Sequence, residues 1–456
     1  MIESVRAAFT LPDLRRRILF TIAMLVIYRL VANIPVPGVD LQAWLVFTAQ
    51  RTGNSVVDFL DLLSGGAVSN FSVMAMGVYP YITASIIIQL LTPIIPQFQE
   101  LQSEGESGRN KLNRYTYFLT VPLAFLQAVG QIRLVGASLT GGVESIMPNF
   151  GFTGANLLPT LTTLVAMVGG TMFAIWLGER ITEEGVGQGI SLIIFGGIVS
   201  GIIPGLAQMF TLEPAARIFS LLTFLLYLVL TVLVIVIIQE GQRRIAVQYG
   251  RRVRGRKIYQ GQSTYIPLKV NTAGMIPIIF AQSILTFFPL IAGLFVTGSG
   301  SVIDNIATAV GNFGTQQNVT TAPVAFTAYW VLYFILVVAF TFFYTDVMIR
   351  QQNLPETLQR QGGFIPGIRP GKRTENYIMS VVRRITLIGA LFLGLIAVLP
   401  GIMAVVALVL QIPGLERSVL VISGSGLIIV VGVVVDTMRQ LEAQLLMRHY
   451  EGFLKS

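Results

Sequence analysis

Long apolar stretches alternate with shorter polar links along almost the whole chain. A bilayer core needs about 20 apolar residues per helix. Ten stretches come close to that length, at 18–34, 74–94, 116–136, 156–177, 188–206, 216–238, 271–294, 323–345, 385–402 and 417–436. The pattern predicts an all-α integral membrane protein with ten transmembrane helices.

The segment before the second stretch breaks this regularity. Residues 59–72 are only half apolar and are interrupted by Gly65-Gly66, and Gly77 and Pro80 follow. Irregular backbone at membrane depth is tolerated only where it is buried in protein or lines a cavity. We therefore expect a short re-entrant half-helix that enters the bundle from outside and leads into the second full helix.

The composition agrees with a membrane protein. Of the 456 residues, 54% are hydrophobic and 12% are charged, whereas soluble domains carry roughly 25% charged residues. The chain has no Cys and a single His. This excludes disulfides, thiolate nucleophiles and Cys-ligated metals, and it leaves little room for His-based catalysis. We expect neither a metal nor another cofactor.

Basic residues are distributed unevenly between the links. If the N-terminus is cytoplasmic, 26 of the 31 Lys and Arg residues fall in cytoplasmic segments and 4 fall outside. This asymmetry follows the positive-inside rule, so both termini are expected in the cytoplasm. The net charge of +9 is then explained by topology. The basic face suits an acidic partner such as a ribosome or a motor protein.

The spans after the first hold almost no ionisable side chains, which disfavours an ion-coupled transporter because retained charges usually mark ion or proton paths. Arg29, near the outer end of the first span, is expected to snorkel to the lipid headgroups. An intramembrane hydrolase would need a nucleophile with a base, and none can be assembled. A ten-span secondary transporter of a small solute remains the alternative, and it predicts a polar rather than an apolar constriction.

Isoleucines recur at helical spacing in two spans. Ile82 and Ile86 share one face of the second span, and Ile190 and Ile194 share one face of the fifth. Such stripes ordinarily face lipid or a protein core. A ring of these stiff, β-branched side chains would instead make a dewetting constriction that excludes ions without using charge.

Two long basic links stand out on the predicted cytoplasmic side. The link 239–270 holds a run of Arg and Lys followed by a strand-like stretch from Ile258 to Tyr265. In the link 346–384, Pro and Gly from Gly363 to Gly371 predict fixed turns that hold Arg369 at a tip.

Several longer motifs together resemble one family. They are Phe59-Leu60-Asp61 with Ser64-Gly65-Gly66, Pro80 to Leu90, Glu104 to Arg109, Trp176 to Glu183, Gly189-Ile190-Ser191, Gly241 to Ile245, Gln262-Ser263-Thr264, Pro267 to Asn271, and Gly363 to Gly371. With these motifs in this order, the chain resembles the SecY family, whose members are channel subunits of the bacterial protein-translocation complex. Gln188 stands where that family often has Asn, and Gly424-Ser425-Gly426 replaces a Gly-Gly-Thr-Ser pattern.

The resemblance implies an architecture of two inverted five-helix halves around a central hourglass pore. The halves would be 1–206, with spans one to five, and 207–456, with spans six to ten and the two long cytoplasmic links. It also implies a plug on the re-entrant segment at about 60–72. The implied plug residues are Leu60, Asp61, Leu62, Leu63, Ser64, Gly65, Gly66, Ala67, Val68, Ser69, Asn70, Phe71 and Ser72.

The resemblance further implies roles for single residues. The pore ring falls on Ile82, Ile86, Ile190, Ile194, Ile279 and Ile429. A lateral gate between spans two and three and spans seven and eight would place Ile87 opposite Phe287. Arg256, Lys257 and Arg369 match basic positions that engage the ribosome or the motor.

The implied function is a path for unfolded secretory polypeptides across the bacterial cytoplasmic membrane, with sideways release of apolar segments into lipid. The chain itself would not be an enzyme. The implied partners are SecE-like and SecG-like small membrane subunits, a SecA-like ATPase motor, the ribosome, signal peptides and nascent membrane proteins, and the lipid bilayer.

Overall fold

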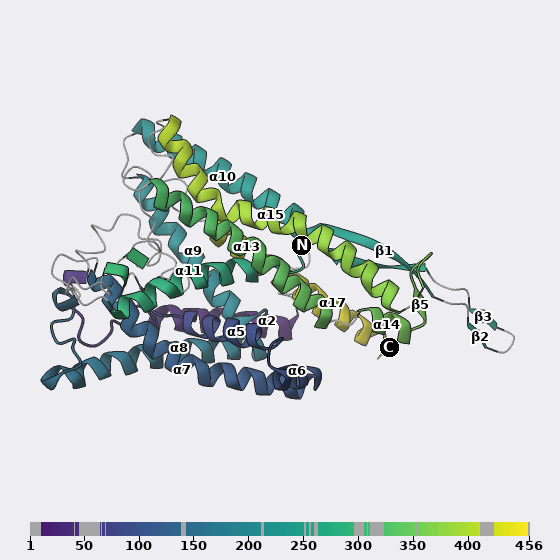
Figure 1. The fold of residues 1–456 in the computed structure, drawn as a ribbon, viewed down its shortest axis with the longest axis horizontal. Helices are drawn as coiled ribbons and strands as arrows, with labels where there is room; N and C mark the ends of the chain where they lie inside the picture. Colours follow the sequence, from purple (N-terminus) through teal and green to yellow (C-terminus); the bar gives the residue numbers. More distant parts are fainter. Residues whose placement is uncertain are drawn as a thin grey trace.

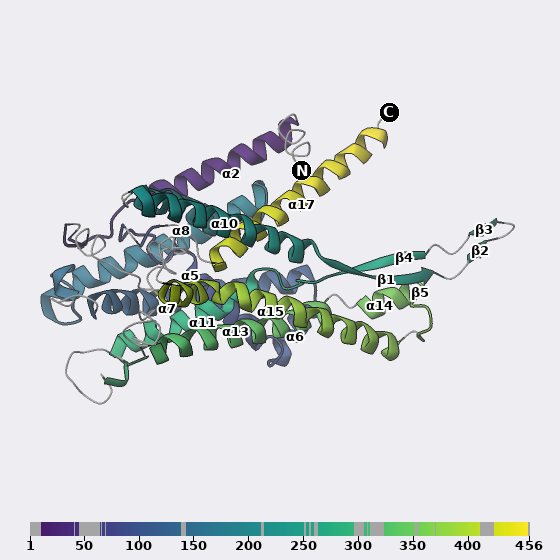
Figure 2. The same cartoon turned by 90° about the horizontal axis from the view of Figure 1, so that it is seen from above.

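The computed structural model is an elongated bundle of long helices that carries a small β-sheet at one end (Figure 1). The strands extend beyond the helices at that end, and α17 (Gly424–Leu454) ends on the same side (Figures 1 and 2). The residues that the structure describes are 11–40, 42–44, 64, 66–68, 70–137, 143–210, 214–249, 252–254, 257–259, 263–295, 305–307, 309–310, 323–351, 354–369, 371–410 and 424–454.

Each of the ten predicted spans overlaps one long helix. The helices are α2 (Pro12–Val31), α5 (Tyr79–Leu91), α6 (Pro96–Ser103), α7 (Glu106–Ala137), α8 (Leu157–Glu184), α9 (Gly189–Phe210), α10 (Pro214–Glu240), α11 (Ile276–Phe295), α13 (Pro323–Gln351), α14 (Leu354–Arg360), α15 (Lys372–Leu410) and α17, with short 3-10 turns at Val143–Ser145 and Gly154–Asn156. Among the described residues, seven helices are long and apolar enough to cross a membrane, or eight if the bent pair α5 and α6 is one span. The predicted all-α membrane fold is confirmed.

Proline sets where several helices begin. Pro80 lies in the first turn of α5 and Pro96 begins α6. Proline is favoured there because the N–H that it lacks would be unpaired in any case. The axes of α5 and α6 meet at 100°, so the chain turns sharply after the second span and α6 packs against the start of α7.

The expected half-helix at about 60–72 differs from what the structure describes. Residues 60–63, 65 and 69 lie outside the described part of the chain, and the described residues from 66 to 78 form turns and one isolated bridge, Pro35↔Ser72. Gly66 and Gly77 adopt φ of +83° and +50°, a left-handed region that ends helices and that glycine enters without steric cost.

The two long basic links fold together. Strand β1 (Gln242–Tyr249) pairs antiparallel with β4 (Ser263–Lys269) on one side and β5 (Gly363–Phe364) on the other. The short strands β2 (Arg252–Arg254) and β3 (Lys257–Tyr259) pair beyond them. A separate small apolar core lies under this sheet, built from Ile245, Val247, Leu268, Ile349, Leu358, Ile365, Ile378 and Val382. The links are thus one structured unit rather than two solvated loops.

Candidate functional site

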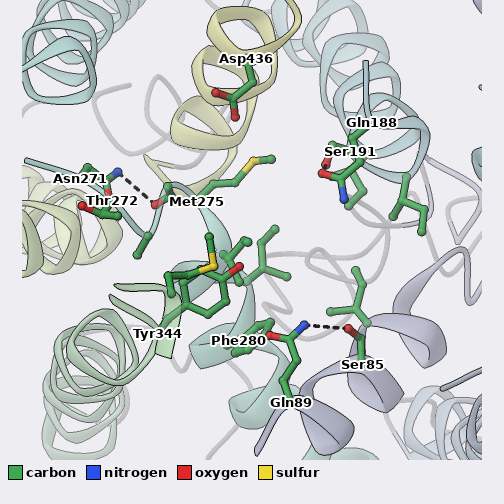
Figure 3. A pocket seen from close by; sticks show the side chains of 18 of the residues that line it. Ser85, Gln89, Gln188, Ser191, Asn271, Thr272, Met275, Phe280, Tyr344 and Asp436 are labelled. Carbon is green, nitrogen blue, oxygen red and sulfur yellow. Dashed lines mark hydrogen bonds between the residues drawn. The ribbon is translucent and has the colours of Figure 1, made fainter. Parts of the chain in front are cut away.

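A cavity of about 350 Å³ opens between helices that are far apart in the sequence. Its walls come from α5, α9, α11, α13 and α17, together with the turn 271–275 before α11. Its lining is mixed. Ser85, Gln89, Gln188 and Ser191 point into it (Figure 3), and isoleucines of α5, α9 and α11 line it as well. The cavity therefore combines hydrogen-bonding groups with aliphatic surface.

The six predicted ring isoleucines are gathered in this region. Ile82, Ile190, Ile194 and Ile279 line the cavity. Ile86 and Ile429 do not line it and are almost fully buried in the large apolar core of the bundle, at 3% and 1% exposure. The other four belong to that core or pack against it. Three helices, α5, α9 and α11, therefore bring four of these isoleucines to one cavity, and the other two lie in the apolar core of the bundle.

Amides, hydroxyls and charged side chains line the same cavity. On α5, Gln89 Nε2 donates to Ser85 Oγ at 3.0 Å; beside the start of α9, Ser191 Oγ donates to Gln188 Oε1 at 3.1 Å (Figure 3). Lys269, Asn271, Asp436 and Arg439 also line the cavity. Arg439 forms an ion pair with Glu240 at 2.7 Å, which joins the middle of α17 to the C-terminal end of α10.

The described part of the predicted plug is hydrogen-bonded to the C-terminal end of α2 and to the residues just after it. Tyr28 Oη donates to the backbone oxygen of Ser64 at 2.6 Å, and Asn70 Nδ2 donates to Asn33 Oδ1 at 2.9 Å. Just beyond α2, the backbone N–H of Val36 donates to Phe71 O at 3.0 Å. Ala67, Val68 and Phe71 are buried in the same core as the isoleucines.

Arg29 does not follow the expectation that it snorkels to the headgroups. Its guanidinium lies over Gly66, so that a Cβ at Gly66 would meet Arg29 Nη1 at 2.9 Å. The side chain is half-buried and turned toward the protein. A position near the end of a span is compatible with either direction, and only the folded chain brings Gly66 within reach.

The predicted lateral gate lies where α11 packs against α5 and α7. Tyr79 Oη donates to Ser283 O at 3.0 Å, and Arg133 Nη1 donates to Leu294 O at 2.6 Å. Between these bonds the helices touch backbone to backbone, because a Cβ at Gly130 would lie 2.3 Å from Leu290 O. Ile87 and Phe287 are each half-buried on α5 and α11.

The basic positions on the links are described only in part. Arg369 is exposed beyond a turn in which Ile368 N–H donates to Ile365 O at 3.0 Å, with Gly367 at φ of +82°. Thr374 Oγ1 donates to Arg369 O at 3.0 Å and fixes the far side of the turn. Lys257 lies in β3, and Arg256 lies outside the described residues.

Two features of this region were missed from the sequence. The alternation of Ile245, Val247 and Tyr249 carries the period of two that marks a strand and could have revealed β1. The fastening of Ser64 and Asn70 to α2 has no sequence signal, because single hydrogen bonds between distant segments leave no periodic pattern.

Comparison with known proteins gives a consistent result. The sequence model of the SecY family matches residues 72–438. The chain is 40% identical over 463 aligned residues to the protein translocase subunit SecY of Halalkalibacterium halodurans, and the alignment covers 100% of both chains. It is 39% identical to the protein of the same name in Escherichia coli, with 98% of this chain and 95% of the relative covered.

Solved structures share the fold. A protein-conducting channel superposes with a TM-score of 0.63 at 18% identity, covering 94% of this chain and 92% of that one. Sec61 from a canine ribosome–channel complex of the endoplasmic reticulum gives a TM-score of 0.58 at 18% identity, with the same coverage.

Proposed function

The chain belongs to the SecY family, and from that premise we propose that it is a protein-conducting channel subunit that passes unfolded polypeptides across the membrane. The observation that supports the proposal is one cavity between helices far apart in the sequence, which four of the six predicted ring isoleucines line together with amides, hydroxyls and charged side chains. A small-solute transporter would bind its substrate through polar groups at the constriction, where we propose that this chain has isoleucine.

The isoleucine ring explains how one path serves many sequences. Aliphatic side chains make no directional bonds, so they pack around any extended chain without favouring one sequence. When no chain is present, the same side chains close on one another and exclude water and ions. Ile86 and Ile429, already buried in the core, would then be the closed part of the ring.

Residues 60–72 would act as the plug on the outer side of the ring. Support comes from the burial of Ala67, Val68 and Phe71 in the same core as the isoleucines. The bonds from Tyr28 and Asn70 would hold this segment in the resting state. An entering polypeptide would displace the segment, and these bonds would break.

The contact of α11 with α5 and α7 would act as the lateral gate between the halves 1–206 and 207–456. Side-chain hydrogen bonds from Tyr79 and Arg133 to backbone oxygens of α11 cross this contact, and separating the helices there would break them while leaving the helices themselves intact. An apolar segment of the passing chain would leave between Ile87 and Phe287. Transfer into lipid stabilises such a segment by roughly 0.8 kcal/mol per buried CH₂.

The β-sheet unit would be the cytoplasmic docking face, with both termini on that side of the bacterial membrane. The tip at Arg369 and the neighbouring Arg256 and Lys257 would meet an acidic surface of the ribosome or of a SecA-like motor. We propose that the chain catalyses no covalent step, so the free energy for movement comes from those partners. SecE-like and SecG-like subunits would complete the complex.

Single cysteines test these roles together, because the natural chain has none. We would place cysteine at Ile86 for the ring, at Phe287 for the gate and at Arg369 for docking, reconstitute the complex with a SecA-like motor, and stall a secretory precursor. Expected thiol crosslinks run from Ile86 to the stalled chain, from Phe287 to its apolar signal segment, and from Arg369 to the motor. Cysteine at Arg369 is expected to be labelled from the cytoplasmic side only.

Matched controls are Leu230, an exposed residue on the membrane-spanning helix α10, and Arg360, exposed on α14. Crosslinks at Leu230 equal to those at Ile86 would contradict the path through the ring. An engaged precursor that never reaches Ile86 would return the transporter alternative to consideration. Equal capture of the motor by Arg360 would remove Arg369 from the docking face.

A further inference from the structure

Two hydrogen-bonded pairs of an amide and a hydroxyl line the cavity. One is Ser85 with Gln89 on α5, and the other is Gln188 with Ser191 at the start of α9 (Figure 3). Each pair has predicted ring isoleucines near it on its own helix. Ile82 lies one turn before Ser85 on the same face of α5, and Ile190 and Ile194 follow Gln188 on α9.

We propose that these pairs form a backbone clamp, a binding site for the peptide groups of an extended polypeptide just before it enters the isoleucine ring. The inference rests on the proposed function and adds to it the chemical group that is recognised. The chemistry fits because a glutamine amide offers two N–H donors and an oxygen acceptor, as a peptide group offers one of each.

The internal bond of each pair orients its amide without saturating it. Gln89 uses one N–H on Ser85, which leaves its oxygen and second N–H. Gln188 uses its oxygen on Ser191, which leaves both of its N–H groups. Both side chains line the cavity, and both pairs are only partly buried or exposed. They therefore combine a fixed direction with spare donors and acceptors.

The position explains why such a clamp is useful. An extended chain that enters the isoleucine ring gives up its hydrogen bonds to water, and aliphatic side chains offer none in return. Neutral amides next to the ring replace part of that hydration at the point of entry. Because they bind the backbone, they discriminate neither charge nor size among the side chains of the polypeptide.

The test uses two forms of one semisynthetic precursor stalled in the reconstituted complex. In the second form, ester groups replace alternate amides of the segment in the cavity, which removes N–H donors while keeping the chain extended. We expect the amide form to dissociate more slowly than the ester form by about two- to tenfold, the range for one neutral hydrogen bond.

The variants then locate the effect. In Gln89→Leu/Gln188→Leu we expect the amide form to dissociate as fast as the ester form, with the ester form itself little changed. Gln359→Leu, a matched exposed glutamine on α14, is expected to behave as the natural chain. Because Gln89 keeps the oxygen that would accept from a peptide N–H, Gln89→Leu alone tests the clamp if the double variant unfolds, and it is expected to lose most of the difference.

Two results would overturn the clamp. The first is a precursor that crosslinks to cysteine at Ile86 but shows no difference between amide and ester forms in the natural chain. The second is a difference that persists unchanged in both glutamine variants. Absence of any crosslink at Ile86 would instead overturn the proposed function itself, and the clamp with it.

Discussion

The isoleucines and the 64–73 segment belong to one apolar core but are held in different ways. The isoleucines are positioned by packing alone, from four helices. The 64–73 segment is positioned by hydrogen bonds to α2 and to the residues just after it, at Ser64, Asn70 and Phe71. Packing tolerates many arrangements, whereas a set of hydrogen bonds favours one.

The difference shows how one closed channel can contain both a constriction of variable width and a segment with two discrete states. Side chains without directional bonds can open to variable widths around a passing chain and close again. A segment held by a few bonds to a neighbouring helix is either fastened or released. The constriction is thus suited to variable contents, and the 64–73 segment is suited to two states.

The largest effect is expected from placing a charge among the isoleucines. Ile86→Asp puts a carboxylate into the closed core, where a charge costs about 2.5–3.5 kcal/mol on insertion scales. We expect water and ions to enter, measured as an ion leak from sealed vesicles in the absence of precursor. Ile86→Leu keeps the volume and the apolar character of the side chain and lowers the free energy of unfolding by less than about 1.5 kcal/mol. Vesicles that contain this variant should not leak ions. A tight Ile86→Asp channel would mean that Ile86 is not part of the seal.

An intermediate effect is expected from straining the segment at Gly66. In Gly66→Ala, a φ of +83° costs about 1–2 kcal/mol for an L-residue, and the new Cβ meets Arg29 Nη1 at 2.9 Å. We expect a cysteine at Asn70 to be labelled about 5- to 30-fold faster, since 1.4 kcal/mol is a factor of ten.

Gly154→Ala is the matched control for that strain. Gly154 has a φ of +59°, but nothing lies within 4 Å of its added Cβ. Labelling at Asn70 should not change in this variant. An equal increase in both variants would show that the effect is general destabilisation rather than release of the segment.

The smallest effect is expected from one hydrogen bond. Tyr28→Phe removes the bond to Ser64 O at 2.6 Å, and a net loss of about 1 kcal/mol predicts roughly fivefold faster labelling at Asn70. Translocation of an engaged precursor should keep its rate, because the bond is already broken by then. Tyr115→Phe, at an exposed tyrosine on α7, controls for the loss of a hydroxyl. A slower translocation rate in Tyr28→Phe, but not in Tyr115→Phe, would show that the Tyr28 hydroxyl acts during translocation and not only in the resting state.

Much of the fold was predictable because a transmembrane helix is decided locally. Its backbone bonds are internal and its apolar length is visible in the sequence, so a helix overlaps each of the ten predicted spans, and among the described residues seven helices, or eight with the bent pair, are long and apolar enough to cross a membrane. The turn at Ile365 to Ile368 was also predictable, since Pro366 and Gly367 favour it through their own backbone preferences. The half-helix was not found in the described residues, because glycines in the left-handed region replaced it with turns.

The sequence by itself determined the class, the spans, the uneven charge and, through its resemblance, the family. Only the tertiary structure decided that Ile82, Ile190 and Ile279 border one cavity, that Arg29 turns toward Gly66, and that β1 pairs with β5 from the other basic link. The physical reason is that hydropathy and helix formation depend on neighbouring residues. Contacts between distant segments depend on which of many similar apolar faces meet, and that choice is made only when the whole chain packs.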